Sequence, residues 1–173
     1  MSEEDLEVGL SRYDNGYLYL PIYNANLEAI INIPSLRELE MSSYDRDLSL
    51  LRKVKTLRVL AVTEVTPNVK SCRDLCQLES LIIPLWDPKD LRDIEHLKQL
   101  KHLDISSYRG KSIEGLASLE NLEELKLSSF KGDFSPLFHL IKLRRVIVNK
   151  IYKKQDLAFL GIQIEIDILS DTY

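Results

Sequence analysis

The sequence repeats one apolar pattern, L-x-x-L-x-L, at a nearly constant interval, with Met, Val or Ile at the third apolar position of most copies and Val at the second apolar position of the last. The intervals between first residues of successive copies are 21, 21, 22, 22 and 21 residues. The six copies begin at Leu36, Leu57, Leu78, Leu100, Leu122 and Leu143. Such a period is typical of a solenoid, in which coils stack because none can bury its apolar stripe alone. The pattern therefore predicts one continuous repeat domain.

The spacing inside each repeat predicts how one coil is built. Apolar residues recur at every third position from Ile113 to Leu125, and Leu127 follows two positions later. A step of three suits a short 3-10 segment, whereas a step of two suits a strand. The expected fold class is therefore an α/β solenoid. It is curved, with a parallel β-sheet on the concave face and short helical or 3-10 segments on the convex face.

The repeat register also predicts how the chain is divided. Residues 1–173 are interpreted as a single domain, with the repeats over residues 15–151. Residues 1–14 are expected to form an N-terminal cap, whose antiparallel strand turns through Asp14-Asn15-Gly16 into the first parallel strand. Residues 152–173 are expected to form a shortened last coil, with acidic residues that discourage pairing at the sheet edge.

Charge and composition exclude several classes of partner. The net charge is −4, and the first residues are acidic, which argues against a nucleic acid because phosphates need a basic surface. The acidic start is also unlike a secretory signal, and the apolar runs are too short to cross a bilayer. Two cysteines make no disulfide framework. We expect a cytoplasmic protein that is a monomer when free and binds neither nucleic acid nor membrane.

These motifs resemble the leucine-rich repeat superfamily over about residues 15–168. Within them, Asp133-Phe134-Ser135-Pro136-Leu137-x-x-Leu140-x-x-Leu143 resembles the short bacterial, internalin-type repeat. The resemblance implies a curved solenoid that recognises other proteins. It implies no reaction.

One slot departs from the pattern of that superfamily, which commonly has Asn eight residues after the first Leu of each motif. Here the slot holds Tyr23, Tyr44, Val65, Trp86, Tyr108, Phe130 and Ile151. One interpretation is a buried aromatic spine, because stacked rings fill volume well. The other is an exposed ridge suited to hot-spot contacts. We favour the spine, with Trp86 as the expected exception.

No motif in the sequence indicates catalysis. Glycine-rich nucleotide-binding loops and the G-x-S-x-G nucleophile motif are absent. His96, His102 and His139 fall in different coils at different repeat positions, and Cys72 and Cys76 lack the spacing of a zinc site. The sequence therefore predicts a non-enzymatic protein without cofactor or metal.

Residues between the buried leucines of each strand are expected to face solvent on the concave side. In the second and third coils they include an apolar patch with acidic residues on either side, which is a common arrangement in protein interfaces. The alternative is that single apolar residues simply tolerate exposure. The predicted partner-binding residues are Tyr17, Tyr19, Glu38, Glu40, Val59, Ala61, Ile82, Pro84, Leu85, Trp86, His102, Asp104 and Glu124.

The predicted function is therefore that of a protein-binding module that occupies a partner's surface. We expect the partner to be a protein with a basic surface patch that complements the acidic residues. The specific hypothesis is a stoichiometric inhibitor, such as an immunity protein against a toxin or enzyme. The alternatives are an adhesion or sensor module from a larger surface protein, and a regulatory adaptor or scaffold.

Overall fold

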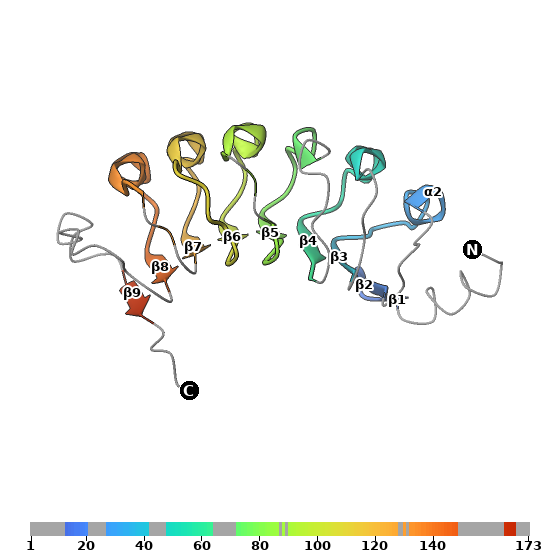
Figure 1. Ribbon diagram of the computed structural model, residues 1–173. Helices are drawn as coiled ribbons and strands as arrows, with labels where there is room; N and C mark the ends of the chain where they lie inside the picture. Colours follow the sequence, from blue (N-terminus) through green and yellow to red (C-terminus); the bar gives the residue numbers. More distant parts are fainter. Residues whose placement is uncertain are drawn as a thin grey trace.

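The chain forms an arch of stacked coils, with strands along its inner side and helical turns along its outer side (Figure 1). This computed structural model describes residues 13–20, 27–41, 48–63, 72–86, 88, 90–127, 130, 132–148 and 165–168. Within these residues, the strands form one nine-stranded sheet in the order of the sequence. No helix in the described part of the chain is long and apolar enough to span a bilayer.

The strands recur once per coil, as the period predicts. They are β1 (Tyr13–Asp14), β2 (Tyr17–Leu20), β3 (Glu38–Met41), β4 (Val59–Val62), β5 (Ser80–Ile82), β6 (His102–Asp104), β7 (Glu124–Leu127), β8 (Arg145–Val148) and β9 (Glu165–Ile168). Pairing is parallel from β2 to β9. The register places Leu103 beside Leu81 on one strand and Leu125 on the other, so that the second Leu of each motif forms a continuous buried row.

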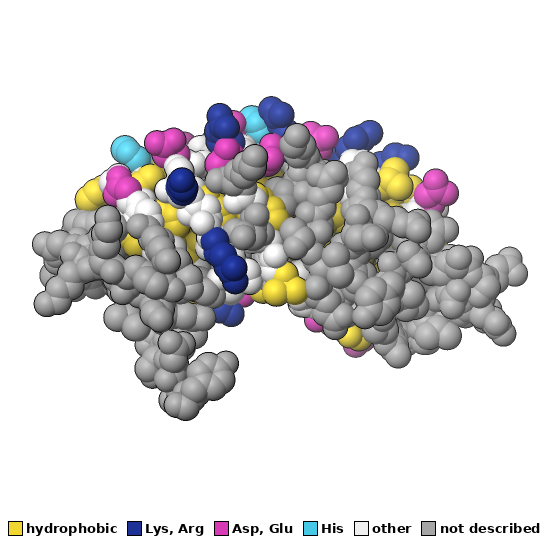
Figure 2. Space-filling view, viewed as in Figure 1, with side chains coloured by type: hydrophobic (Ala, Val, Ile, Leu, Met, Phe, Trp, Pro, Cys, Tyr) yellow, Lys and Arg dark blue, Asp and Glu magenta, His cyan; other side chains and the backbone are white. Residues whose placement is uncertain are grey.

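Short helical segments form the outer side of the arch. They include α2 (Leu27–Ile30) and the 3-10 segments η1 (Ser49–Lys53), η3 (Arg92–Ile94), η4 (Glu114–Ser118) and η5 (Ser135–His139). Asp90, Ser112 and Asp133 hold the same place before η3, η4 and η5, and each side chain accepts a hydrogen bond from the backbone N–H two residues later. These local bonds favour the turn into each segment. Figure 2 shows charged side chains gathered along this outer side.

The aromatic slot is buried wherever the structure describes it. Trp86 is 2% exposed, Tyr108 is fully buried, and Phe130 stacks on Tyr108 with ring centroids 6.1 Å apart. The favoured interpretation, a buried spine, is confirmed for these three positions. The prediction that Trp86 would be the exposed exception is wrong, because Trp86 belongs to the same buried core cluster as the other two. Tyr23, Tyr44, Val65 and Ile151 lie outside the described residues.

Two glycines leave room for the rings of this spine. A Cβ at Gly110 would approach the Tyr108 ring to 2.2 Å, and one at Gly132 would approach the Phe130 ring to 2.4 Å. Both glycines lie two residues after the aromatic residue. The ring therefore folds back over the chain that follows it, which only a residue without a side chain permits.

The first parallel strand is preceded by a hairpin. β1 pairs with β2 in antiparallel fashion, and the turn residues Asn15 and Gly16 have φ angles of 48° and 92°. Both angles lie in the region that two-residue hairpin turns require. The remainder of the expected cap, residues 1–12, lies outside the described residues, and so do residues 152–164 and 169–173 of the expected last coil, so the domain boundaries stay predictions.

Candidate protein-binding surface

Parallel register aligns the outward residues of β2 to β8 into two rows, which together form the concave face. The first row is Tyr17, Glu38, Val59, Ser80, His102, Glu124 and Arg145. The second row is Tyr19, Glu40, Ala61, Ile82, Asp104, Lys126 and Ile147. Residues 21 or 22 apart in sequence thus become neighbours across one strand spacing, about 4.8 Å.

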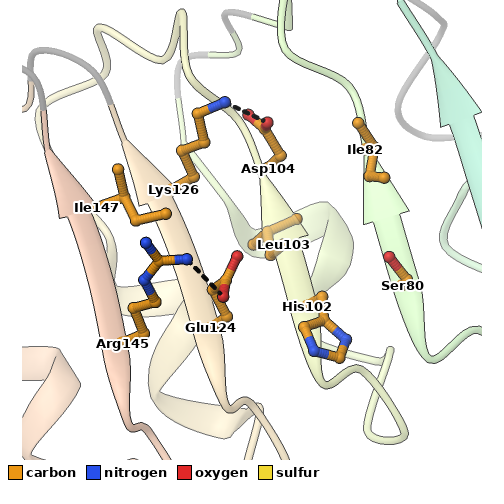
Figure 3. Close-up of a pocket in the computed structure, with 9 residues that line it drawn as sticks. All are labelled: Ser80, Ile82, His102, Leu103, Asp104, Glu124, Lys126, Arg145 and Ile147. Atoms are coloured by element: carbon orange, nitrogen blue, oxygen red, sulfur yellow. Dashed lines mark hydrogen bonds and ion pairs between the residues drawn. The ribbon is translucent and has the colours of Figure 1, made fainter. Parts of the chain in front are cut away.

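The concave face is hollowed over β5 to β8 (Figure 3). The hollow has a volume of about 510 Å³ and lies on the face of the sheet, because all of its lining residues belong to strands. Its lining residues are Ser80, Ile82, His102, Leu103, Asp104, Glu124, Lys126, Arg145 and Ile147. Because rigid parallel strands supply all nine, the lining is held in a fixed arrangement.

Two ion pairs cross the hollow from strand to strand. Lys126 Nζ lies 3.0 Å from Asp104 Oδ2, and Arg145 Nη1 lies 3.5 Å from Glu124 Oε2. The other oxygen of Asp104 accepts the backbone N–H of Ser106 at 3.0 Å and also the Ser106 hydroxyl. Asp104 is therefore held at both oxygens, which fixes the direction of its charge.

The N-terminal end of the concave face is aromatic and acidic. The Tyr17 hydroxyl donates a hydrogen bond to Glu40 Oε2 at 2.9 Å, and this bond raises the pKa of Tyr17 above its ordinary value. Glu38, beside Tyr17 in the register, is exposed. No Lys or Arg occupies the two rows on β2 to β4. A partner meeting this end therefore meets negative charge and aromatic surface.

A second set of charges lies immediately before the strands. Glu79 binds Lys101 Nζ at 2.6 Å and lies 3.5 Å from Arg58 Nε. The hydrogen bond from Lys101 lowers the pKa of the Glu79 carboxyl, and the same bond raises the pKa of Lys101. Each member comes from a different coil, so this cluster ties three consecutive coils together.

The structure distributes the predicted binding residues over three places. Those that line the hollow are Ile82, His102, Asp104 and Glu124. Those at the aromatic and acidic end are Tyr17, Tyr19, Glu38 and Glu40. The other five lie on β4 or near the end of β5. Contact of any of them with a partner stays a prediction.

The predicted apolar patch is smaller than the sequence indicated. Ala61 is only 7% exposed and Trp86 only 2%, so the expectation that these two present apolar surface to a partner was wrong. Ala61 has only a methyl side chain, and Trp86 belongs to the buried core cluster. Val59 and Pro84 are half-buried, and Leu85 is exposed just beyond β5.

The sequence reasoning did not select five residues of the hollow: Ser80, Leu103, Lys126, Arg145 and Ile147. Four of them occupy outward strand positions, and Leu103 is a buried strand residue beneath the hollow. The predicted binding residues were mostly those with apolar or acidic side chains in the first coils and their neighbours. A signal was present in the opposite charges of Asp104 and Lys126, and of Glu124 and Arg145, at matching positions of successive coils.

The described residues bring together no group of three or more His, Cys, Asp or Glu that could hold a metal ion. His96 lies on the outer side, 3.6 Å from Glu95, whereas His102 is on β6 and His139 is in η5. Cys72 is buried in the core and Cys76 is exposed, and the two are not joined by a disulfide.

Comparison with solved structures shows which fold this is. Internalin C2 from Listeria monocytogenes matches with a TM-score of 0.67 and 23% identity over 83% of this chain and 67% of that one. Internalin F from the same organism matches with a TM-score of 0.64 and 23% identity over 83% of this chain and 46% of that one. The chain thus has an internalin-like leucine-rich repeat fold, as its sequence predicted. No family model matches the sequence, and no curated protein matches it either.

The same fold also occurs in the crystal structure of the TLR13–ssRNA13 complex. That match has a TM-score of 0.60 and 20% identity, and it covers 81% of this chain and 22% of the other. Of these three structures, this chain spans about two thirds of one and less than half of each of the others. Likeness at this level of identity establishes the fold of the chain.

Proposed function

We propose that this leucine-rich repeat chain is a non-enzymatic module that binds another protein through its concave face. The observation that carries the proposal is the hollow over β5 to β8, which combines apolar and charged side chains on one rigid sheet. A mixed surface of this kind matches the composition of protein interfaces. The acidic and aromatic end at β2 and β3 extends the same surface.

The charges of the face favour a protein over a nucleic acid, although one structure of the same fold contains ssRNA13. Glu38 and Glu40 at the acidic end would repel phosphates. Lys126 and Arg145, the two basic residues of the hollow, are already paired with carboxylates. A partner with a basic patch would meet the acidic end with complementary charge, which speeds association.

The finer part of the proposal is that the protein acts in the cytoplasm as a monomeric inhibitor, such as an immunity protein against a toxin or enzyme. A module that blocks a surface by occupying it needs no reaction of its own. An adaptor would use the same face but leave its partner active. An adhesion or sensor module would be found at the cell surface.

Capture of the partner from native lysate, followed by mass spectrometry, tests the concave face. Glu38→Arg with Glu40→Arg replaces two negative charges by two positive ones, and like charges across an interface weaken binding by about tenfold or more. The matched control is Glu114→Arg with Glu120→Arg, which makes the same charge change at exposed positions in and beside η4. The wild type and the control should retain the partner, and the concave variant should lose it.

Equal retention by all three proteins would move the binding site away from the concave face. Once the partner is purified, titration separates the roles. Loss of the partner's activity with an end point at one equivalent is expected for an inhibitor. A bound partner that stays fully active would indicate an adaptor, and fractionation with the cell surface would indicate an adhesion or sensor module.

A further inference from the structure

The two ion pairs give the hollow a regular charge pattern. In each pair the acid lies one strand before the base: Asp104 on β6 with Lys126 on β7, and Glu124 on β7 with Arg145 on β8. The pairs lie in different rows, so the two acids form one diagonal and the two bases form a second (Figure 3). The two diagonals are parallel, and each base lies one strand spacing, about 4.8 Å, beyond the acid in the same row.

These four charges sum to zero, unlike the acidic end at β2 and β3. A purely basic or purely acidic surface would therefore meet as much repulsion as attraction over the hollow. The charged groups nevertheless remain accessible, since the side chains of Lys126, Glu124 and Arg145 are 37–40% exposed and that of Asp104 is 20% exposed. They can form ion pairs with a partner while staying close to each other.

The two ion pairs differ in the distance between their charged atoms and in their additional hydrogen bonds. Asp104 has hydrogen-bond donors at both oxygens, and its distance to Lys126 is 3.0 Å. Glu124 and Arg145 are separated by 3.5 Å, which is long for a charged hydrogen bond. The second pair is therefore the one that a partner separates with least loss.

We propose, on the basis of the protein-binding function above, that the hollow binds a mixed-charge segment of the partner protein. A basic side chain of that segment binds the acid diagonal of Asp104 and Glu124. An acidic side chain binds the base diagonal of Lys126 and Arg145, one strand spacing away. Apolar atoms of the segment that flank its basic side chain pack on Ile82 at the β5 side of the hollow, since Ile147 at the other side is only 8% exposed.

This pattern selects the order of charges as well as their presence. A segment whose acid and base are exchanged places like charges against like, and such contacts are what exclude wrong partners. Recognition by order distinguishes the hollow from the acidic end, which attracts any basic surface.

The test uses random 12-residue peptides displayed on phage and selected on the wild-type protein. The decisive variant is Glu124→Arg with Arg145→Glu, which keeps the ion pair and the net charge but reverses its direction. The control is Arg52→Asp with Asp74→Arg, which reverses an exposed pair on the outer side, 4.0 Å apart. Binding of a selected peptide is measured by fluorescence polarisation, and thermal unfolding verifies that each variant is folded.

Selected peptides should carry a base and an acid at a constant spacing. Their affinity should fall by about tenfold or more on the reversed variant, as expected for like charges brought together, and stay unchanged on the control. Lys126→Gln, which removes one base without reversing a pair, should weaken the same peptides less.

Enrichment of purely basic peptides that respond to Glu38→Arg with Glu40→Arg, or no enrichment, would overturn the inference about the hollow. The protein-binding function would then still stand on native capture. Equal retention of the partner by the wild type, the Glu38→Arg with Glu40→Arg variant and the control would instead contradict the proposed function of the concave face. The two failures are thus distinguishable.

Discussion

Replacing Leu125 by alanine tests the stacked core at its most regular point. Leu125 lies at the middle of β7, fully buried, with Leu103 and Val146 beside it on the neighbouring strands. The change removes three carbons, worth roughly 2.4 kcal/mol at about 0.8 kcal/mol for each buried CH₂. A cavity of roughly 80 Å³ that does not relax would add up to about 2 kcal/mol. The expected loss of unfolding free energy is therefore about 2.5–4.5 kcal/mol.

Urea unfolding followed by far-UV circular dichroism measures this loss, and Leu85→Ala is the matched control. Leu85 is 45% exposed, so the same substitution there should cost about 1 kcal/mol or less. The m value should be unchanged, because a smaller m would indicate that the stack unfolds in parts. Equal losses at the two leucines, with unchanged m, would refute the placement of Leu125 in a continuous core.

Three further predictions concern contacts between coils or turns. The hydrogen bond from Lys101 lowers the pKa of Glu79 in the folded state, so this pair stabilises the fold at neutral pH and its contribution is lost as pH falls below about 4.5. Glu79→Gln should therefore lower the melting temperature at pH 7 and make the melting temperature decline less steeply toward pH 3. An unchanged decline would contradict this prediction. Gly115→Ala places a Cβ 2.4 Å from the Leu91 carbonyl oxygen, so calorimetry should show a loss of about 1–3 kcal/mol in the free energy of unfolding. An unchanged melting temperature would count against this close packing. Tyr108→Phe removes the hydroxyl donor to the Ser112 carbonyl, and chemical unfolding should show a loss of about 0.5–1.5 kcal/mol, whereas a stabilised variant would argue against the bond.

Much of the fold could be predicted because the repeat carries its information locally. A step of three or two residues decides which side chains face inward, so the buried leucines, the parallel strands and the 3-10 segments follow from short-range spacing. The turn at Asn15-Gly16 has the backbone angles that its residue types favour. Such features do not depend on what another coil does.

The candidate site was predicted only in part, because a surface depends on neighbours that are distant in sequence. Outward strand positions were identified correctly as a class, but their relative exposure was not. Ala61 and Trp86 were selected for apolar character, and both are buried. Lys126 and Arg145 were passed over, although each pairs with an acid on the preceding strand.

The sequence by itself thus determined the solenoid, its period and the inward face of every described coil, because side-chain periodicity acts within a few residues. Only the tertiary structure decided where the concave face is hollowed and which charges pair across it. Those properties arise when register brings together residues 21 or 22 positions apart, and when the size and direction of neighbouring side chains set what stays open to a partner. The hollow over β5 to β8 is a product of stacking, and no single repeat contains it.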